Sequence, residues 1–190
     1  MRLWTIHPCF LSKIYLTALW AEGHLALSVF EGATKSYKNH PQLERFKIPN
    51  GPDRVLLTKL YLNYAYMINS YVFKMNFNKN RISGITNENN VMNPEARSLL
   101  RTIKVPYGQV LFELWYYANV KNVGKNKSMY VKNQRTFMMD IISNAQSGIN
   151  ALVNPIFTID EEDTNIASWE KTFNSNPVLR WAYCDYKAQL

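Results

Sequence analysis

The sequence is poor in the residues that build metal sites, disulfide frameworks and membrane spans. Its 190 residues contain only two cysteines, Cys9 and Cys184, at opposite ends of the chain, together with three histidines. None of these residues has the spacing of metal ligands, so the sequence predicts no metal and no cofactor. Without a disulfide framework, a reducing intracellular setting is the default. The sequence also lacks an apolar run of about 18 residues, a glycine-rich phosphate loop and a G-x-S-x-G nucleophile turn.

Acidic residues are in the minority, with 14 Asp and Glu against 22 Lys and Arg and a formal net charge of +8. This imbalance favours a polyanionic partner, nucleic acid first and an acidic membrane surface second, although a solvated basic surface explains it equally well. Between residues 35 and 47, cations are interleaved with rings: Lys35, Lys38, Arg45 and Lys47 with Tyr37, His40 and Phe46. Such cations neutralise phosphates and such rings stack on bases, but Phe46 fits the core equally well.

Strand-like alternation is nearly absent, whereas apolar residues recur at the three- and four-residue spacing of helices. Helices are expected from Ser12 to about Phe30, from Asp53 to about Met75, from Asn93 to Arg101, from Pro106 to about Val120 and from Tyr130 to about Ala145. Hydrophobic residues make up 47% of the chain, which is enough for a proper core. The sequence therefore predicts a compact, single-domain, all-α fold over residues 1–173, with an N-terminal arm packed against the helices and a C-terminal extension over residues 174–190.

The first expected helix contains a carboxylate, Glu22, among apolar residues. A carboxylate in such a border suits proton transfer near neutral pH, although composition alone favours an ordinary surface glutamate. The neighbouring Gly23 costs about 1 kcal/mol in mid-helix relative to alanine. It is either merely tolerated or allows another backbone or a ligand to approach beside Glu22.

The chain begins with Met1 and Arg2. An α-amine has an ordinary pKa of about 7.7–8.0, so roughly a tenth of it is neutral and nucleophilic at pH 7. A terminal amine held near a carboxylate can attack an electrophilic carbon without a nucleophilic side chain. Met1 and Glu22 are therefore candidates for an imine-forming pair.

Three segments, MRLWTIHPCFL, ALWAEGHLALSVF and YKNHPQLERF, resemble the pyrimidine-dimer DNA glycosylase family typified by the phage endonuclease V, and most closely its cellular branch. Weaker similarity through VPYGQVLFELW and NPIF…SWEK extends the resemblance to about residues 1–171. The family implies a compact helical fold and a two-step activity. Its N-terminal α-amine attacks the deoxyribose C1′ of a damaged nucleotide and releases the base, and the resulting imine permits a β-elimination that nicks the strand.

The resemblance implies that Met1 provides the amine and Glu22 the essential carboxylate. The 21-residue spacing between them equals that of the family, and Arg2 is too large to favour removal of Met1. Arg2 matches a DNA-contacting arginine beside the nucleophile. The sequence departs from the phage pattern at Ala21 and Leu25, where that pattern has arginines, so the identity of the lesion stays open.

The sequence thus predicts a bifunctional DNA glycosylase and AP lyase that acts on damaged double-stranded DNA. We expect a monomer that is intracellular, DNA-associated and not membrane-bound; cytoplasm, nucleoid, nucleus and a viral origin all stay open. The predicted DNA contacts are Arg2, Trp20, Lys35, Tyr37, Lys38, His40 and Arg45. Trp20, Tyr37 and His40 are candidates for filling the gap left by a displaced nucleotide. A non-catalytic DNA-binding module and an RNA-binding protein are the alternatives.

Overall fold

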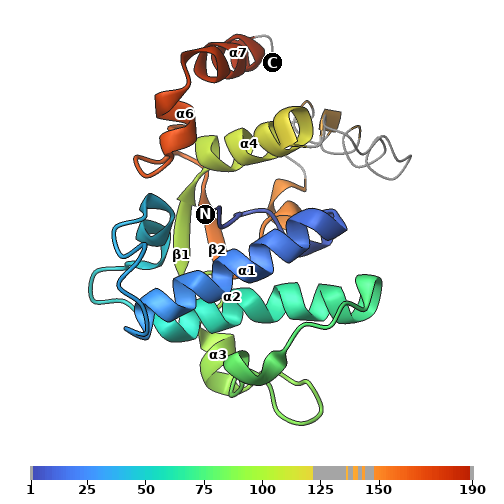
Figure 1. Cartoon of the computed structure of the whole chain (residues 1–190). Helices are drawn as coiled ribbons and strands as arrows, with labels where there is room; N and C mark the ends of the chain where they lie inside the picture. The colour runs from blue at the N-terminus through green and yellow to red at the C-terminus, as the bar shows by residue number, and fades with distance from the viewer. Residues whose placement is uncertain (1, 122–135, 137–138, 141–142, 144–147, 189–190) are drawn as a thin grey trace.

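A computed structural model describes residues 2–121, 136, 139–140, 143 and 148–188 (Figure 1). Most of these residues are helical, which confirms the predicted mostly-α class. The α-helices are α1 (Lys13–Phe30), α2 (Arg54–Ile68), α3 (Pro94–Ser98), α4 (Tyr107–Tyr116), α6 (Lys171–Ser175) and α7 (Pro177–Ala188). The shorter elements are η1 (Pro8–Phe10), η2 (Pro41–Phe46), η3 (Asn69–Phe73), η4 (Lys79–Ile82), η5 (Tyr117–Lys121) and η6 (Ile149–Leu152). Most of the helix expected at 130–145 lies outside the described residues.

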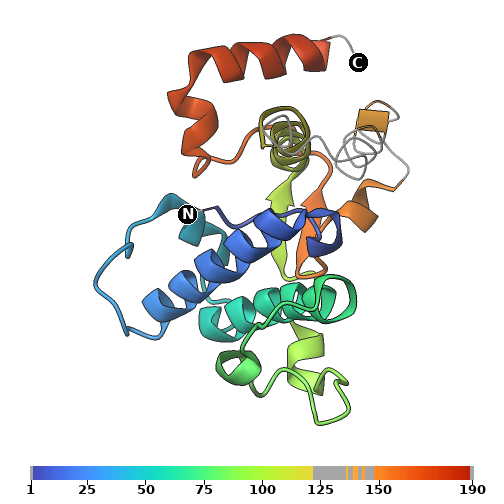
Figure 2. The ribbon, with the colours of Figure 1, turned by 45° about the vertical axis from the view of Figure 1, so that its right-hand side comes forward.

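A small parallel sheet was not expected from the sequence. Strand β1 (Ile103–Pro106) pairs with β2 (Phe157–Asp160), with Ile103 opposite Phe157 and Pro106 opposite Asp160. Pro106 therefore ends a strand as well as preceding α4. Figures 1 and 2 place the two strands between α4 on one side and the pair α1–α2 on the other. The sheet thus joins the two helical layers of the molecule.

Helices α1 and α2 lie side by side, and their contact depends on Gly23 (Figures 1 and 2). A Cβ atom at Gly23 would lie 2.5 Å from Cδ2 of Leu62, which is fully buried on α2. Gly23 therefore permits a close approach, one of the two interpretations left open by the sequence, although the approaching group is a core side chain. As predicted, α2 is capped by Asp53, whose carboxylate accepts a hydrogen bond from the Val55 N–H at 2.8 Å.

Gly23→Ala is expected to lower the free energy of unfolding by up to about 2 kcal/mol. Alanine gains about 1 kcal/mol in helix propensity, but overpacking a filled core costs about 1–3 kcal/mol. Urea denaturation of Gly23→Ala, Leu62→Ala and the double variant measures the effect and its coupling. The double variant should be more stable than the sum of the single effects, since Leu62→Ala opens the space that the new methyl needs. A Gly23→Ala protein more stable than the wild type would contradict this account.

The N-terminal arm, residues 2–7, runs through the interior rather than over the surface. Leu3, Trp4, Thr5 and Ile6 are all buried. Ile6 forms an antiparallel bridge with Val153, and the Thr5 carbonyl accepts a hydrogen bond from the backbone of Asn154 at 2.8 Å. These contacts agree with the arm that was predicted to pack against the helices.

The C-terminal segment packs on α4. Tyr183 of α7 donates a hydrogen bond from its hydroxyl to the Gly108 carbonyl at 3.2 Å and meets Phe112 edge to face. The domain boundary predicted at residues 173 and 174 falls inside α6. None of the helices in the described part of the chain combines the length and apolar character needed to cross a membrane.

Candidate active site at the N-terminal arm

A buried polar network holds the N-terminal arm. Glu113 of α4 is fully buried and accepts hydrogen bonds from the Thr5 backbone N–H at 2.5 Å and from the Thr5 hydroxyl at 3.1 Å. It also pairs with Arg45 at 3.0 Å. Gln42 accepts hydrogen bonds from the Leu3 N–H at 3.1 Å and from Arg45 at 2.9 Å. The Leu3 N–H, the Thr5 N–H and the Thr5 hydroxyl, which the arm brings into the core, are thereby paired, as burial requires.

Arg2 is held by a second carboxylate. Its two terminal nitrogens donate to the two oxygens of Glu170, both at 2.8 Å, and one of them also donates to the Thr172 hydroxyl at 2.9 Å. The guanidinium lies over the rings of Trp4 and Tyr116, at 5.1 and 4.8 Å from their centroids. Arg2 was predicted to contact DNA, and three of its five N–H donors are engaged within the protein in this structure.

Gln109 of α4 links the two carboxylates. Its side-chain amide donates to Glu113 at 3.0 Å and to Glu170 at 3.2 Å, while its oxygen accepts from the Ala167 N–H. Burial alone would raise the pKa of Glu170, but hydrogen bonds and charge from Arg2, with further contributions from Gln109 and Arg45, hold that pKa below its usual range. Glu170 is therefore a buried carboxylate stabilised in its charged form.

Acidification is expected to unfold the protein partly through Glu170. Because the folded-state pKa of Glu170 is depressed, its contribution is complete above the unfolded-state pKa and is lost as pH falls through the folded-state value. Denaturant unfolding from about pH 7 to about pH 3 measures the loss. Glu170→Gln, which has no titrating group, should flatten the acid limb. An identical acid limb in the variant would show that other carboxylates control it.

Glu22 lies half-buried on α1, the helix that follows the arm and η1 in the chain. Met1, its predicted partner, lies outside the described residues. Burial lowers the pKa of His40, the positive charge of the α-amino terminus lowers it further, Glu22 raises it and Lys171 lowers it again. Glu22 and Lys171 therefore lie within electrostatic reach of His40. The sequence analysis did not identify Lys171, at the start of α6, because it is far along the chain from Met1, Glu22 and His40.

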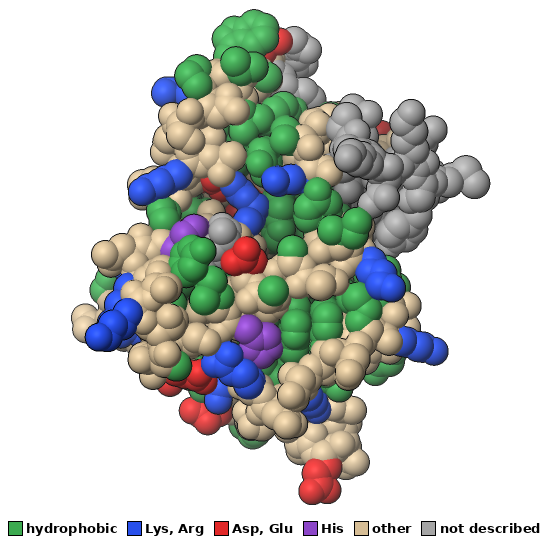
Figure 3. Space-filling model, in the orientation of Figure 1, with side chains coloured by type: hydrophobic (Ala, Val, Ile, Leu, Met, Phe, Trp, Pro, Cys, Tyr) green, Lys and Arg blue, Asp and Glu red, His purple; other side chains and the backbone are tan. Residues whose placement is uncertain are grey.

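Beside Glu22, the exposed face of α1 has uncharged and mostly short side chains. The exposed or half-buried residues of this strip are Thr17, Ala18, Ala21 and Leu25. Ala21 and Leu25, two positions at which the resemblance led us to expect arginines, therefore put no positive charge on this strip. Figure 3 views the molecule from the side of α1 and shows basic side chains distributed around the edge of this face.

Arg81 of η4 is one cation that a distant segment places against α1. It donates to Glu31 at 2.6 Å and to the Ser28 hydroxyl at 3.1 Å. Burial lowers the pKa of the nearby His24, Arg81 lowers it further, and Glu31 opposes them. No local motif marks Arg81, because its position depends on tertiary contact with α1.

The segment from Lys35 to Lys47, in which cations are interleaved with aromatic rings, has some residues at the surface and others in the core. Lys35, Tyr37 and Lys38 are exposed in the loop after α1. Tyr37 adopts a left-handed backbone with φ of 61°, and its ring centroid lies 6.0 Å from that of His40. Nδ1 of His40 accepts a hydrogen bond from the Gln42 N–H at 3.2 Å, which fixes the ring at the start of η2.

Arg45 requires a correction. It was predicted to contact DNA, but it is 5% exposed and its guanidinium pairs with Glu113 and lies 4.2 Å from the Trp169 ring centroid. A phosphate cannot reach it without opening the core. Phe46 is also a core residue, at 1% exposure. Trp20 stacks on Phe77 with centroids 4.5 Å apart, so one face of its indole is already covered.

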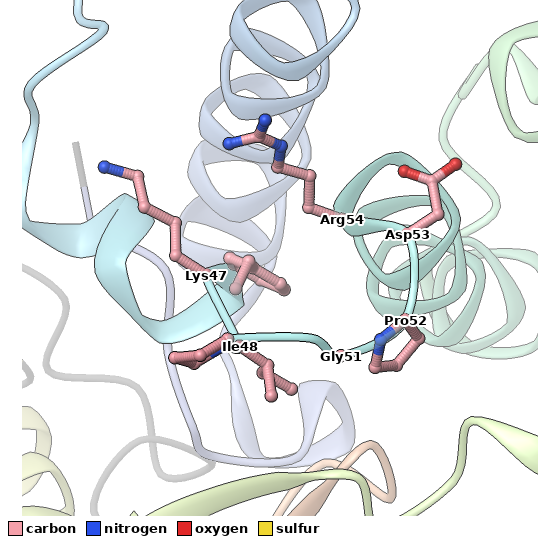
Figure 4. A pocket seen from close by; sticks show the side chains of 8 residues that line it. Lys47, Ile48, Gly51, Pro52, Asp53 and Arg54 are labelled. Atoms are coloured by element: carbon pink, nitrogen blue, oxygen red, sulfur yellow. The ribbon is translucent and has the colours of Figure 1, made fainter.

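A separate cavity of about 440 Å³ lies before α2, lined by Phe46, Lys47, Ile48, Pro49, Gly51, Pro52, Asp53 and Arg54. Figure 4 shows Lys47 and Arg54 projecting to the same side. Lys47 pairs with Glu44 at 2.6 Å, and Arg54 lies 5.6 Å from the Phe30 ring centroid. The predicted catalytic residues do not line this cavity, so it is distinct from the candidate active site.

Comparison with known proteins finds a family match in the N-terminal part of the chain. Residues 1–71, which include the arm, α1 and η2, match the family model described as pyrimidine dimer DNA glycosylase. No curated protein and no solved structure matches the chain. The matched region contains Glu22 and His40, whereas Lys171 and the two buried carboxylates lie beyond it.

Proposed function

We propose that the chain is a DNA repair glycosylase with an associated AP-lyase activity, because its residues 1–71 match the family model described as pyrimidine dimer DNA glycosylase. Its substrate is damaged double-stranded DNA containing a pyrimidine dimer or a related lesion. The observation that supports this most strongly is the buried arm, which hydrogen bonds tie to Glu170, Gln42 and Glu113. Figures 1 and 2 show this arm next to α1, the helix that contains Glu22.

The proposed reaction begins with the neutral α-amine of Met1. Its nitrogen attacks C1′ of the damaged nucleotide, the bond from C1′ to the base breaks, and the base departs with the electron pair and a proton. The sugar ring then opens to an imine between the α-nitrogen and C1′. Glu22 accepts the C2′ proton, the C3′–O bond breaks and the 3′ phosphate leaves. Water finally hydrolyses the imine and restores the amine.

The charges around the arm suit this chemistry. The charges of the N-terminus and Lys171 lower the pKa of His40, and Glu22 raises it. These groups therefore share one electrostatic environment. Cations close to an α-amine disfavour its ammonium form and increase its neutral, nucleophilic fraction. Glu22 opposes them before attack and stabilises the positive imine after it.

DNA is proposed to lie along the exposed face of α1. The short side chains of Thr17, Ala18 and Ala21 leave room for close approach, and cations from other segments neutralise the phosphates. Lys35, Lys38 and Lys171 are the exposed cations proposed for this role. Tyr37 and His40 are proposed to fill the space left when a nucleotide is displaced from the stack.

Lys171→Gln is expected to weaken DNA binding and to reduce the slope of log K against log salt by about 0.9, the effect of one lost phosphate contact on a duplex. Affinity for a duplex with a stable abasic-site analogue is measured over a series of salt concentrations. Arg97→Gln is the matched control, since Arg97 is exposed on α3 and α2 separates it from α1 in Figure 1. Equal slopes for both variants would remove Lys171 from the interface.

Borohydride trapping tests the proposed function directly. Incubation of the protein with abasic-site duplex and borohydride should leave a covalent protein–DNA adduct, since the reductant converts the imine to a stable amine. Peptide mass spectrometry should locate the DNA on Met1. An adduct-free protein that still binds duplex DNA would favour the non-catalytic module, an interpretation motivated by the uncharged positions Ala21 and Leu25. Preference for single-stranded RNA would favour the RNA-binding alternative.

A further inference from the structure

We infer that the ion pair between Arg2 and Glu170 is a latch that positions the N-terminal residue for catalysis, and that Arg2 acts as an anchor and not as a phosphate contact. This inference rests on the proposed imine chemistry at Met1. It assigns a positioning role to Glu170, which lies outside the matched residues 1–71 and is separated from Arg2 by 168 residues in sequence.

The contacts of Arg2 occupy three of the five N–H donors of its guanidinium. Both terminal nitrogens donate to Glu170 in a bidentate pair at 2.8 Å, and Thr172 accepts a third hydrogen bond at 2.9 Å. The rings of Trp4 and Tyr116 lie close to the guanidinium. Only 14% of the Arg2 side chain is exposed. A bidentate pair fixes direction as well as distance, which is what an anchor requires.

Glu170 is itself immobilised. Its side chain is 1% exposed, and it accepts a hydrogen bond from Gln109 at 3.2 Å as well as those from Arg2. It also caps the following turn by accepting from the Thr172 N–H at 3.1 Å. Since Gln109 also donates to Glu113, the anchor is continuous with the network that holds Thr5. Because these contacts fix the position of the Glu170 carboxylate, the ion pair also fixes the position of the Arg2 guanidinium.

The latch lies one residue from the proposed nucleophile. Neighbouring α-carbons are about 3.8 Å apart, so fixing Arg2 restricts the space that the amine of Met1 can occupy. The Leu3 N–H is held by Gln42 on the other side of Arg2. A displacement of about 1 Å at a reacting group can cost about 100-fold in rate, so the latch should influence the reaction far more than the affinity for DNA.

Three variants separate an anchor from a phosphate contact: Arg2→Gln, Arg2→Lys and Glu170→Gln. Glutamine and lysine at position 2 are large enough to keep Met1 in place, which alanine would not ensure, and intact mass verifies the N-terminus. For each variant we would measure two quantities. One is the single-turnover rate of adduct formation with abasic-site duplex at saturating DNA and with borohydride present. The other is the affinity for an uncleavable abasic-site analogue over a series of salt concentrations.

For an anchor, Arg2→Gln and Glu170→Gln should both slow trapping at saturating DNA by about 100-fold, with affinity and salt slope unchanged. The double variant should be no slower than the slower single variant, because both changes remove the same interaction. Arg2→Lys should also be slow, since an ammonium cannot make the bidentate pair.

For a phosphate contact, Arg2→Gln should lower the salt slope by about 0.9, Arg2→Lys should bind normally and Glu170→Gln should trap at the wild-type rate. That pattern, or wild-type rates in all three variants, would overturn the inference. Glu95→Gln and Arg97→Gln, which change exposed residues of α3, are the matched controls. If Glu170→Gln fails to fold, the two Arg2 variants still separate the two patterns.

Hydrogen exchange provides a readout that does not depend on the reaction. Loss of the latch should speed amide exchange in peptides covering Leu3–Ile6, with the exchange of α2 unchanged. Wild-type protein that forms no adduct would contradict the proposed function, whereas unchanged exchange in Glu170→Gln and Arg2→Gln would contradict the latch. The two failures are therefore distinguishable.

Discussion

Glu22→Gln is expected to slow strand cleavage by about 100- to 10,000-fold, the usual contribution of a positioned general base. Glutamine keeps the size of the side chain but cannot accept the C2′ proton or balance the positive charge of the imine. Because Glu22 lies on the flank of α1 and not in the core, the fold should survive the change. Binding to an uncleavable abasic-site duplex should be equal to or slightly tighter than that of the wild type, since one negative charge is removed from the interface.

The measurement is single-turnover cleavage of abasic-site duplex, with the trapped adduct followed in parallel. Glu31→Gln is the matched control, because Glu31 lies at the end of the same helix and pairs with Arg81. Normal trapping with slow cleavage in Glu22→Gln would place Glu22 in the elimination step, and loss of both would give it a role in attack as well. A wild-type cleavage rate would remove Glu22 from the mechanism.

An uncleaved N-terminal extension is expected to abolish adduct formation altogether. The extension converts the α-amine into an amide, whose nitrogen lone pair is delocalised and does not attack C1′. The same extension at the C-terminus should leave trapping intact, and proteolytic removal that regenerates Met1 should restore it. Circular dichroism and DNA affinity establish that the blocked protein is folded.

An adduct that persists in the blocked protein would identify a lysine as the nucleophile. Lys171 is the first residue to test in that case, because its charge acts on His40 together with Glu22. Lys171→Gln in the blocked background should then remove the remaining adduct. Persistence in both proteins would contradict the assignment of the reaction to this end of the molecule.

The helices were predictable because their signals are local. The Asp53 cap and the apolar periodicity of α1 and α2 depend on residues a few positions apart, and the observed starts agree with them. The sheet was not predictable, since each strand has only four residues and β1 includes a proline. Its pairing joins segments about fifty residues apart, which periodicity cannot detect.

The sequence named candidate site residues only in its N-terminal part, and the roles of Met1, Glu22 and His40 stay predictions. The motifs around Met1, Glu22 and His40 lie within the segment that matches the family. Arg45 was misplaced because its spacing among aromatic residues looks the same whether it faces solvent or a buried carboxylate. Glu170 has no local signal at all, since its importance depends on Arg2 at the other end of the chain.

The partners of the N-terminal arm also determine when it can be placed during synthesis. The hydrogen-bond partners of residues 2–5 include Gln42, Glu113, Asn154 and Glu170, all of which are synthesised later. Such non-local contacts form late in folding, because loop closure precedes the gain from contact. A nascent chain that ends before Glu170 therefore lacks the ion pair that holds Arg2. We therefore expect the proposed strand cleavage to appear only after residue 170 has been translated.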